Sequence, residues 1–155
     1  MSPSRKARLT VIVLMAILGA TFFFGFLSED MGHVTEEQRD TVSQTLVLRY
    51  IVAMALGGAI GGAITAGLFG RHGVLGWLLG FVGGVLASLL GGFFGSALGL
   101  VPDLISSGFV LPDVVAVGFG FVLIPLSLVG EPLMVAVWLA LVVITHVLAR
   151  RARNG

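Results

Sequence analysis

Residues 57–99 read GGAIGGAITAGLFGRHGVLGWLLGFVGGVLASLLGGFFGSALG, and small residues recur in this stretch at intervals of four. Row 1 precedes the central turn and contains Gly58, Gly62, Ala66 and Gly70. Row 2 follows the turn and contains Gly76, Gly80, Gly84, Ser88, Gly92 and Ser96. Row 3 lies beside row 2 and contains Gly83, Ala87, Gly91, Gly95 and Gly99. In water each glycine weakens a helix by ~1 kcal/mol relative to alanine. In a bilayer the same spacing creates flat faces for close helix packing, so the stretch predicts a tight, antiparallel glycine-zipper hairpin of membrane helices.

The composition of the whole chain agrees with a membrane protein. Of 155 residues, 57% are hydrophobic even without the 23 glycines, and only 11% are charged. A soluble domain carries about 25% charged residues. The chain has no cysteine, which excludes disulfides, thiolate metal sites and cysteine nucleophiles. We therefore predict an all-α membrane protein in which residues 1–155 form a single integral membrane domain surrounded by the lipid bilayer.

Five apolar segments follow from the positions of the polar residues, glycines and prolines. They are residues 9–27, 50–70, 74–100, 113–129 and 132–149. A hydrocarbon core of ~30 Å is crossed by about 20 helical residues. The first segment is longer than the apolar core of a signal peptide and no small-residue cleavage site follows it, so we interpret it as an anchor. Residues 28–49 are predicted to form a polar loop, residues 101–112 a second loop, and Gly130-Glu131-Pro132 a turn.

The charges leave two topologies open. If all five segments cross the membrane, lysine and arginine show no bias between the two sides. If segment 113–129 is broken or re-entrant, Arg39 and Arg49 lie outside with all eight acidic residues, and the other basic residues lie inside. Those inside are Arg5, Lys6, Arg8, Arg71, Arg150, Arg151 and Arg153. The positive-inside rule favours this second topology, with a cytoplasmic N-terminus and loop 28–49 periplasmic or external. The length of segment 113–129 favours a full crossing.

The glycine-rich hairpin and its basic turn carry a family resemblance. The pattern from Gly57 to Gly99, with Arg71-His72-Gly73 at the turn, resembles the small bacterial membrane proteins called transglycosylase-associated proteins. The last segment, which ends in Arg150-Arg151, is similar to theirs as well. The resemblance covers about half of the chain and implies small glycine-rich membrane helices. It implies no chemistry. Together with the preference for arginine over lysine, it favours a bacterial inner membrane.

Two ionisable residues are candidates for a site. His146 lies within an apolar segment and could ligate the metal of a haem or chlorophyll, but its place four residues before Arg150 favours an interfacial histidine without a ligand. Glu131 could serve proton or cation transport beside segment 113–129, or could stabilise the start of the last helix. A further set of hydroxyls could line a polar path, or bond to carbonyls of their own helix. They belong to Thr65, Ser88, Ser96, Ser127 and Thr145. We predict no catalytic residues, metal site, cofactor or nucleic-acid partner.

The packing residues lead to a prediction of function. The predicted helix-packing interface comprises Gly58, Gly62, Ala66, Gly76, Gly80, Gly84, Ser88, Gly83, Ala87, Gly91 and Gly95. Row 1 is expected to pack on one row of helix 74–100, which leaves row 3 to face another membrane subunit or a second copy. We therefore predict a non-enzymatic accessory, assembly or structural subunit of a larger bacterial membrane complex. The alternative is a small oligomeric transporter or channel that uses segment 113–129.

Overall fold

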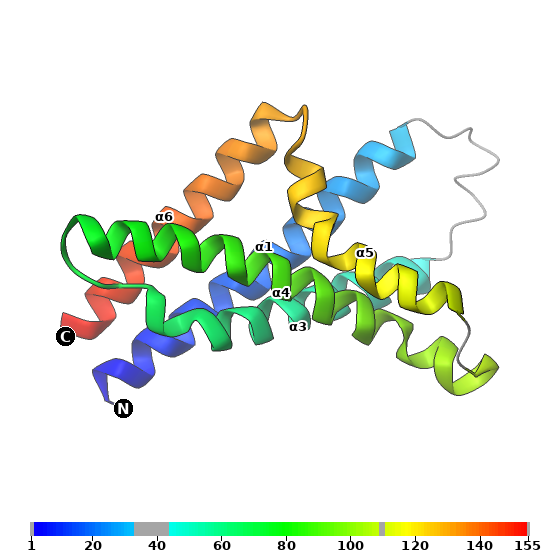
Figure 1. Ribbon diagram of the computed structural model, residues 1–155, viewed down its shortest axis with the longest axis horizontal. Coiled ribbons are helices and arrows are strands. Elements are labelled where there is room, and N and C mark those ends of the chain that lie inside the picture. Colours follow the sequence, from blue (N-terminus) through cyan, green and yellow to red (C-terminus); the bar gives the residue numbers. More distant parts are fainter. Residues whose placement is uncertain (1, 33–43, 109–110, 155) are drawn as a thin grey trace.

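The chain folds into a bundle of helices (Figure 1). The structure, a computed structural model, describes residues 2–32, 44–108 and 111–154. In chain order the helices are α1 (Pro3–Gly32), α3 (Gln44–Thr65), the short 3₁₀ helix η1 (Ala66–Leu68), α4 (Gly73–Ser107), α5 (Leu111–Leu128) and α6 (Pro132–Asn154). The predicted all-α class is confirmed. So are the five apolar segments, because five of these helices are long and apolar enough to cross a membrane.

The helices extend beyond the predicted apolar segments, and both predicted loops are shorter as a result. Residues 28–32 complete α1 and residues 44–49 begin α3, while residues 33–43 lie outside the described part of the chain. The loop predicted for residues 101–112 is largely wrong, because α4 continues to residue 107 and α5 begins at residue 111.

An ion pair explains why α4 continues through Pro102, a residue that removes one helical hydrogen bond. Directly after this proline, Asp103 receives two hydrogen bonds from Arg49 of α3, with Nη1–Oδ1 and Nη2–Oδ2 distances of 3.1 and 2.7 Å. The end of α4 is thereby attached to the start of α3. The helix finally ends at Gly108, which has a φ of +74° and donates its N–H to the carbonyl oxygen of Leu104.

Segment 113–129, predicted as possibly broken, is a continuous helix. α5 contains Pro125 and runs without interruption from residue 111 to residue 128. Close neighbours explain the continuity, since Leu123, Ile124 and Ser127 are buried on both sides of the proline. The turn predicted at Gly-Glu-Pro is present: Gly130 has a φ of +83°, and α6 begins at Pro132.

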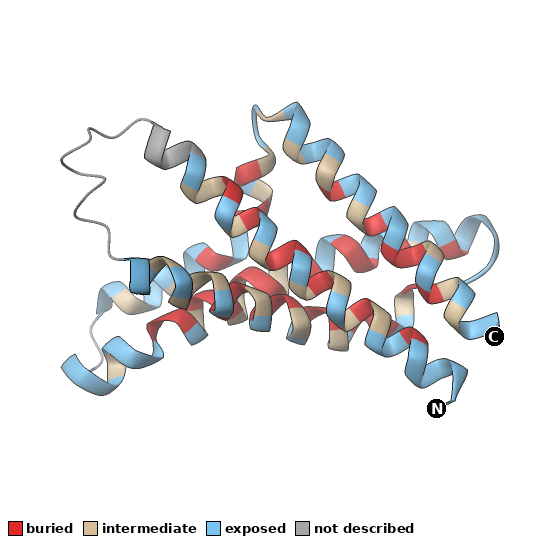
Figure 2. Ribbon diagram, turned by 180° about the vertical axis from the view of Figure 1, so that it is seen from behind, coloured by how far each residue is buried: buried red, intermediate tan, exposed pale blue. Residues whose placement is uncertain are grey.

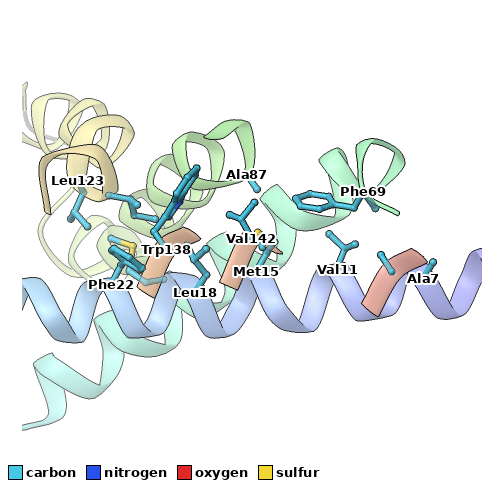
Figure 3. Close-up of a cluster of buried hydrophobic side chains, with 14 residues drawn as sticks. Ala7, Val11, Met15, Leu18, Phe22, Phe69, Ala87, Leu123, Trp138 and Val142 are labelled. Atoms are coloured by element: carbon cyan, nitrogen blue, oxygen red, sulfur yellow. The ribbon is translucent and has the colours of Figure 1, made fainter. Parts of the chain in front are cut away.

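The core of the bundle is built on one face of α1. Its buried side chains recur every three or four residues, as expected for a helix with one covered face, and are Ala7, Val11, Met15, Leu18 and Phe22. They pack against side chains from the rest of the chain, among them Phe69, Leu123, Trp138 and Val142 (Figure 3). The outward faces of the helices are exposed along much of their length (Figure 2).

The N-terminus, the connection between α3 and α4, and the C-terminus lie at one end of the molecule (Figure 1). α1 and α6 run obliquely across α3 and α4, in opposite directions (Figure 1). Nη2 of Arg153 donates to the carbonyl oxygen of Ala66 at 3.3 Å. Gly70 also lies directly on α6, because a methyl group added there would be 2.8 Å from the nitrogen of Arg150. The connection after α3 is therefore packed against the end of α6.

Candidate functional site

Row 3 of α4 packs against α3. A methyl group added at Gly61 of α3 would lie 2.6 Å from the carbonyl oxygen of Ala87 and 3.0 Å from the nitrogen of Gly91. One added at Gly57 would lie 2.7 Å from Cα of Gly95. The remaining members of row 3 also face this side: Gly99 contacts the ring of Tyr50, and Gly83 contacts Leu68 and Phe69. The two helices are thus in backbone contact along a seam where Gly57 and Gly61 of α3 meet Ala87, Gly91 and Gly95 of α4.

The α3 residues in this seam differ from those predicted. Row 1 was expected to face α4, but Gly58 and Gly62 face α1: Gly58 lies against the backbone of Met15, and a methyl group at Gly62 would lie 2.8 Å from the Met15 Cβ. Gly91 still approaches Gly58, so this glycine is close to both helices. The physical reason is that adjacent positions on a helix are about 100° apart, so Gly57 and Gly61 present a second small face.

Row 2 of α4 faces α6 and α5. A methyl group at Gly84 would lie 2.6 Å from the Val142 side chain of α6, and Gly80 gives room to the His146 ring. Ser88 accepts a 2.9 Å hydrogen bond from Nε1 of Trp138. Further along α4, Gly92 and Ser96 lie against Gly120 of α5, while Gly76 lies on the backbone of Arg71 at the turn.

Both rows of α4 are therefore covered by helices of the same chain. The prediction that row 3 faces another subunit or a second copy is wrong, because α3 occupies it. The prediction assumed that one helix would use one row. It missed that several helices cover α4, among them α3 on row 3 and α6 and α5 on successive parts of row 2. Ala66, also predicted for the interface, is buried in η1, where its carbonyl accepts from Arg153.

His146 joins α6 to the turn between α3 and α4. It is buried, and its Nδ1 accepts from the N–H of Gly70 at 3.4 Å, while Nε2 lies 3.2 Å from the carbonyl oxygen of Arg71. One neutral tautomer, with the proton on Nε2, satisfies both contacts. The ring also stacks on Trp77, with centroids 4.5 Å apart. Because both ring nitrogens are engaged by the backbone, neither is free to ligate a metal in this arrangement.

Four of the five buried hydroxyl groups bond within their own helices, and the fifth belongs to Ser96. Thr65, Ser88 and Thr145 donate to the carbonyl four residues earlier, and Ser127 to the carbonyl three residues earlier. This arrangement follows the helix-internal alternative that the sequence left open. Each of these donors is satisfied locally, so none of the four hydroxyls needs water or a solute to complete its bonding.

Glu131 lies in the turn before α6 and is partly exposed. Its carbonyl oxygen accepts from the N–H of Val135 at 3.1 Å, which places it at the first turn of the helix. A carboxylate at this position interacts favourably with the positive end of the helix dipole. Among the described residues, no group of three or more His, Cys, Asp or Glu side chains gathers where a metal ion could bind.

Five glycines with close contacts lie outside the predicted rows: Gly19, Gly25, Gly57, Gly61 and Gly120. Gly19 of α1 lies against the backbone of Met54, and Gly120 of α5 against that of Gly92. Gly57 could have been found, because Gly57 and Gly61 repeat the spacing of row 1 one position earlier. Gly19 and Gly25 share a segment but are six residues apart, so neither belongs to a four-residue repeat of glycines.

Comparison of the chain with protein-family models, with curated proteins and with solved structures gave no match. The resemblance to transglycosylase-associated proteins thus stays a prediction. The function is therefore inferred from the geometry of the helices and from which of their faces are covered.

Proposed function

We propose that the protein is a multi-pass membrane protein with a non-enzymatic role, as an accessory, assembly or structural subunit of a larger membrane complex. The five apolar helices support insertion into a bilayer, and large apolar side chains on their outer faces suit contact with lipid. Four hydroxyl groups of the interior and its histidine are engaged by nearby backbone or side-chain groups, which leaves little chemistry for catalysis.

The outer face of α5 is the single observation that favours a partner. Only Gly120, Leu123, Ile124 and Ser127 of this helix are buried. On the opposite side, Gly118 has no atom within 4 Å of the place where a side chain would begin. A glycine that meets only lipid lowers helix propensity without improving packing, so it calls for a helix outside this chain. We therefore propose that the partner binds the outer face of α5 and not row 3 of α4.

A hollow next to Gly118 has the chemistry of a helix-packing surface. It is lined by Leu111, Pro112, Val115, Ala116 and Phe119, has a volume of about 560 Å³ and is almost entirely apolar. Leu111 is 78% exposed. In a membrane, helices associate through close packing of small residues and apolar surfaces rather than through charge. A transmembrane helix of another subunit is therefore the occupant that fits this face.

The basic residues orient the protein in our proposal. Arg5, Lys6, Arg8 and Arg71 belong to the same end of the molecule as the arginines after residue 149. The positive-inside rule places this end in the cytoplasm, and loop 28–49 on the periplasmic or external side of a bacterial inner membrane. This orientation requires that α5, although a continuous helix, enters and leaves the membrane on the same side.

Mild-detergent extraction at native expression levels tests the proposed function. Wild-type protein should be recovered in an assembly heavier than the 16.1 kDa chain. Gly118→Leu should release a folded chain from the assembly, and Ala140→Leu, an exposed change on α6, should leave the assembly intact. A wild-type monomer without partners would contradict the proposal. If that monomer also moved a solute into liposomes at a rate sensitive to Glu131→Gln, transport would replace it.

A further inference from the structure

Two cavities open at the end of the molecule where the termini and the α3–α4 turn meet. The larger, of about 470 Å³, combines Arg71, His72 and Arg153 with the apolar side chains of Leu75 and Leu79. The smaller, of about 220 Å³, lies among Ser4, Arg8 and Arg153, next to η1. Arg153 lines both cavities, so the two are neighbouring compartments of one basic site.

The turn holds two of these arginines in place. Nε of Arg71 donates to the carbonyl oxygen of Gly67 at 2.9 Å, and Nη2 of Arg153 donates to that of Ala66 at 3.3 Å. A guanidinium group has five N–H donors, so each side chain is positioned by one bond and keeps others for a ligand. These two arginines are therefore pre-oriented toward the cavities by backbone carbonyls.

The basic site has no acidic counterpart among the described residues. The ion pair between Arg49 and Asp103 lies far from the cavities, at the opposite end of α4. None of the chain's acidic residues lies in the segments that line the cavities. The positive charge of Arg8, Arg71 and Arg153 is thus available to an anion from outside the chain.

The shape and lining of the larger cavity fit a phosphate that carries hydrocarbon. Guanidinium groups bind phosphate through paired, charge-assisted hydrogen bonds. Leu75, which is 67% exposed, and Leu79 form an apolar wall beside the arginines, as an acyl chain would require. Basic pockets between membrane helices on the cytoplasmic side are suited to anionic lipid headgroups.

The geometry points to a binding site for the headgroup of an anionic phospholipid, with one phosphate between Arg71 and Arg153 and a second near Arg8. A lipid with two phosphodiesters, such as cardiolipin, matches the two compartments and their shared arginine. This inference depends on insertion into a membrane, which the proposed function includes, but it needs no protein partner. Its failure would leave the partner face on α5 untouched.

Native mass spectrometry of the full chain in detergent tests the site, with cardiolipin, phosphatidylglycerol, phosphatidylcholine or inorganic phosphate added. We expect cardiolipin to bind most tightly and Arg153→Gln to weaken its binding about tenfold. Arg151→Gln is the matched control, because it removes the same charge from the same helix but lines neither cavity. The affinity of Arg151→Gln for cardiolipin should stay within about twofold of that of the wild type.

Three results would overturn the inference. The first is an equal loss of cardiolipin binding in Arg153→Gln and Arg151→Gln. The others are binding of phosphatidylcholine, or of inorganic phosphate alone, as tight as that of cardiolipin. The last result would indicate a soluble anion instead of a lipid. If Arg153→Gln does not fold, Arg8→Gln decides in its place, because Arg8 lines the smaller cavity at the exposed start of α1. Cardiolipin binding by Arg8→Gln should weaken toward that of phosphatidylglycerol. Unchanged binding would contradict the two-compartment site.

Discussion

Arg153 in the last turn of α6 donates to the carbonyl oxygen of Ala66, 87 residues earlier in the chain. With the contacts of His146 to Gly70 and Arg71, this bond attaches the end of α6 to the turn between α3 and α4. α1 begins at the same end (Figure 1). The arrangement gathers the basic residues of three separate segments, and it is compatible with the topology that the positive-inside rule favours.

The α3–α4 seam can be tested with a single methyl group. Gly61→Ala places that group 2.6 Å from a backbone oxygen of α4, and the two helices must separate to accept it. We expect a loss of stability of about 1–3 kcal/mol, measured by thermal unfolding in detergent with circular dichroism. Gly67→Ala is the control, because the added group meets nothing within 4 Å. Equal melting temperatures for the two variants would place the seam elsewhere.

Two glycines of α5 offer a matched test on one helix. Gly120→Ala would drive its methyl group into Gly92 and Ser96 of α4, whereas at Gly118 the added group has open space. In the isolated chain, Gly120→Ala should lower the free energy of unfolding by about 1–3 kcal/mol. Gly118→Ala should raise it by up to ~1 kcal/mol through helix propensity. The opposite ranking would mean that α5 is turned the other way.

A double-mutant cycle can measure the hydrogen bond between Trp138 and Ser88. Trp138→Phe retains most of the ring that packs edge-on against Phe81 but removes the indole N–H. Its coupling with Ser88→Ala should be about 0.6 kcal/mol and no more than ~1.7 kcal/mol, the range found inside membranes. Thr145→Val serves as the control partner, since Thr145 donates to its own helix. A coupling of zero with Ser88→Ala would exclude the bond.

His146 is expected to be structural. Replacing it with leucine leaves the N–H of Gly70 and the carbonyl of Arg71 without this partner, which should cost about 1–3 kcal/mol of stability. His72→Leu, at the exposed turn nearby, should be nearly neutral. Absorbance after addition of haem distinguishes this structural role from a role as a haem ligand. A specific haem spectrum that disappears only in His146→Leu would show that this histidine is a ligand.

The sequence predicted the helices and their small faces better than the pairing of those faces. Small residues at intervals of four identify a helix that packs closely, because only a flat face admits another backbone. They do not identify the neighbour. Gly57 and Gly58 lie about 100° apart on α3, and which of them meets α1 or α4 depends on how the whole bundle is arranged.

Interactions between residues far apart in the sequence explain the other differences between the predicted and the observed structure. Pro102 and the polar residues after it predict a loop locally. The bond from Arg49, 54 residues away, is not visible in that stretch and extends the helix. The basic cavities likewise depend on three segments that meet only in the folded chain, although each segment's charge could be read from the sequence. Their composition therefore predicted the orientation in the membrane but not a binding site.

Site-specific labelling tests the central claim most directly: one end of the bundle, with both termini and the α3–α4 turn, lies on one side of a membrane. The chain has no cysteine, so Ser4→Cys, His72→Cys, Asn154→Cys and Ser107→Cys each provide a single reactive site. A membrane-impermeant maleimide should label Ser107→Cys when added to the outside of intact cells, and the other three only when added to sealed inside-out vesicles. Labelling of Ser4→Cys and Asn154→Cys from opposite sides would contradict the account and establish five full crossings.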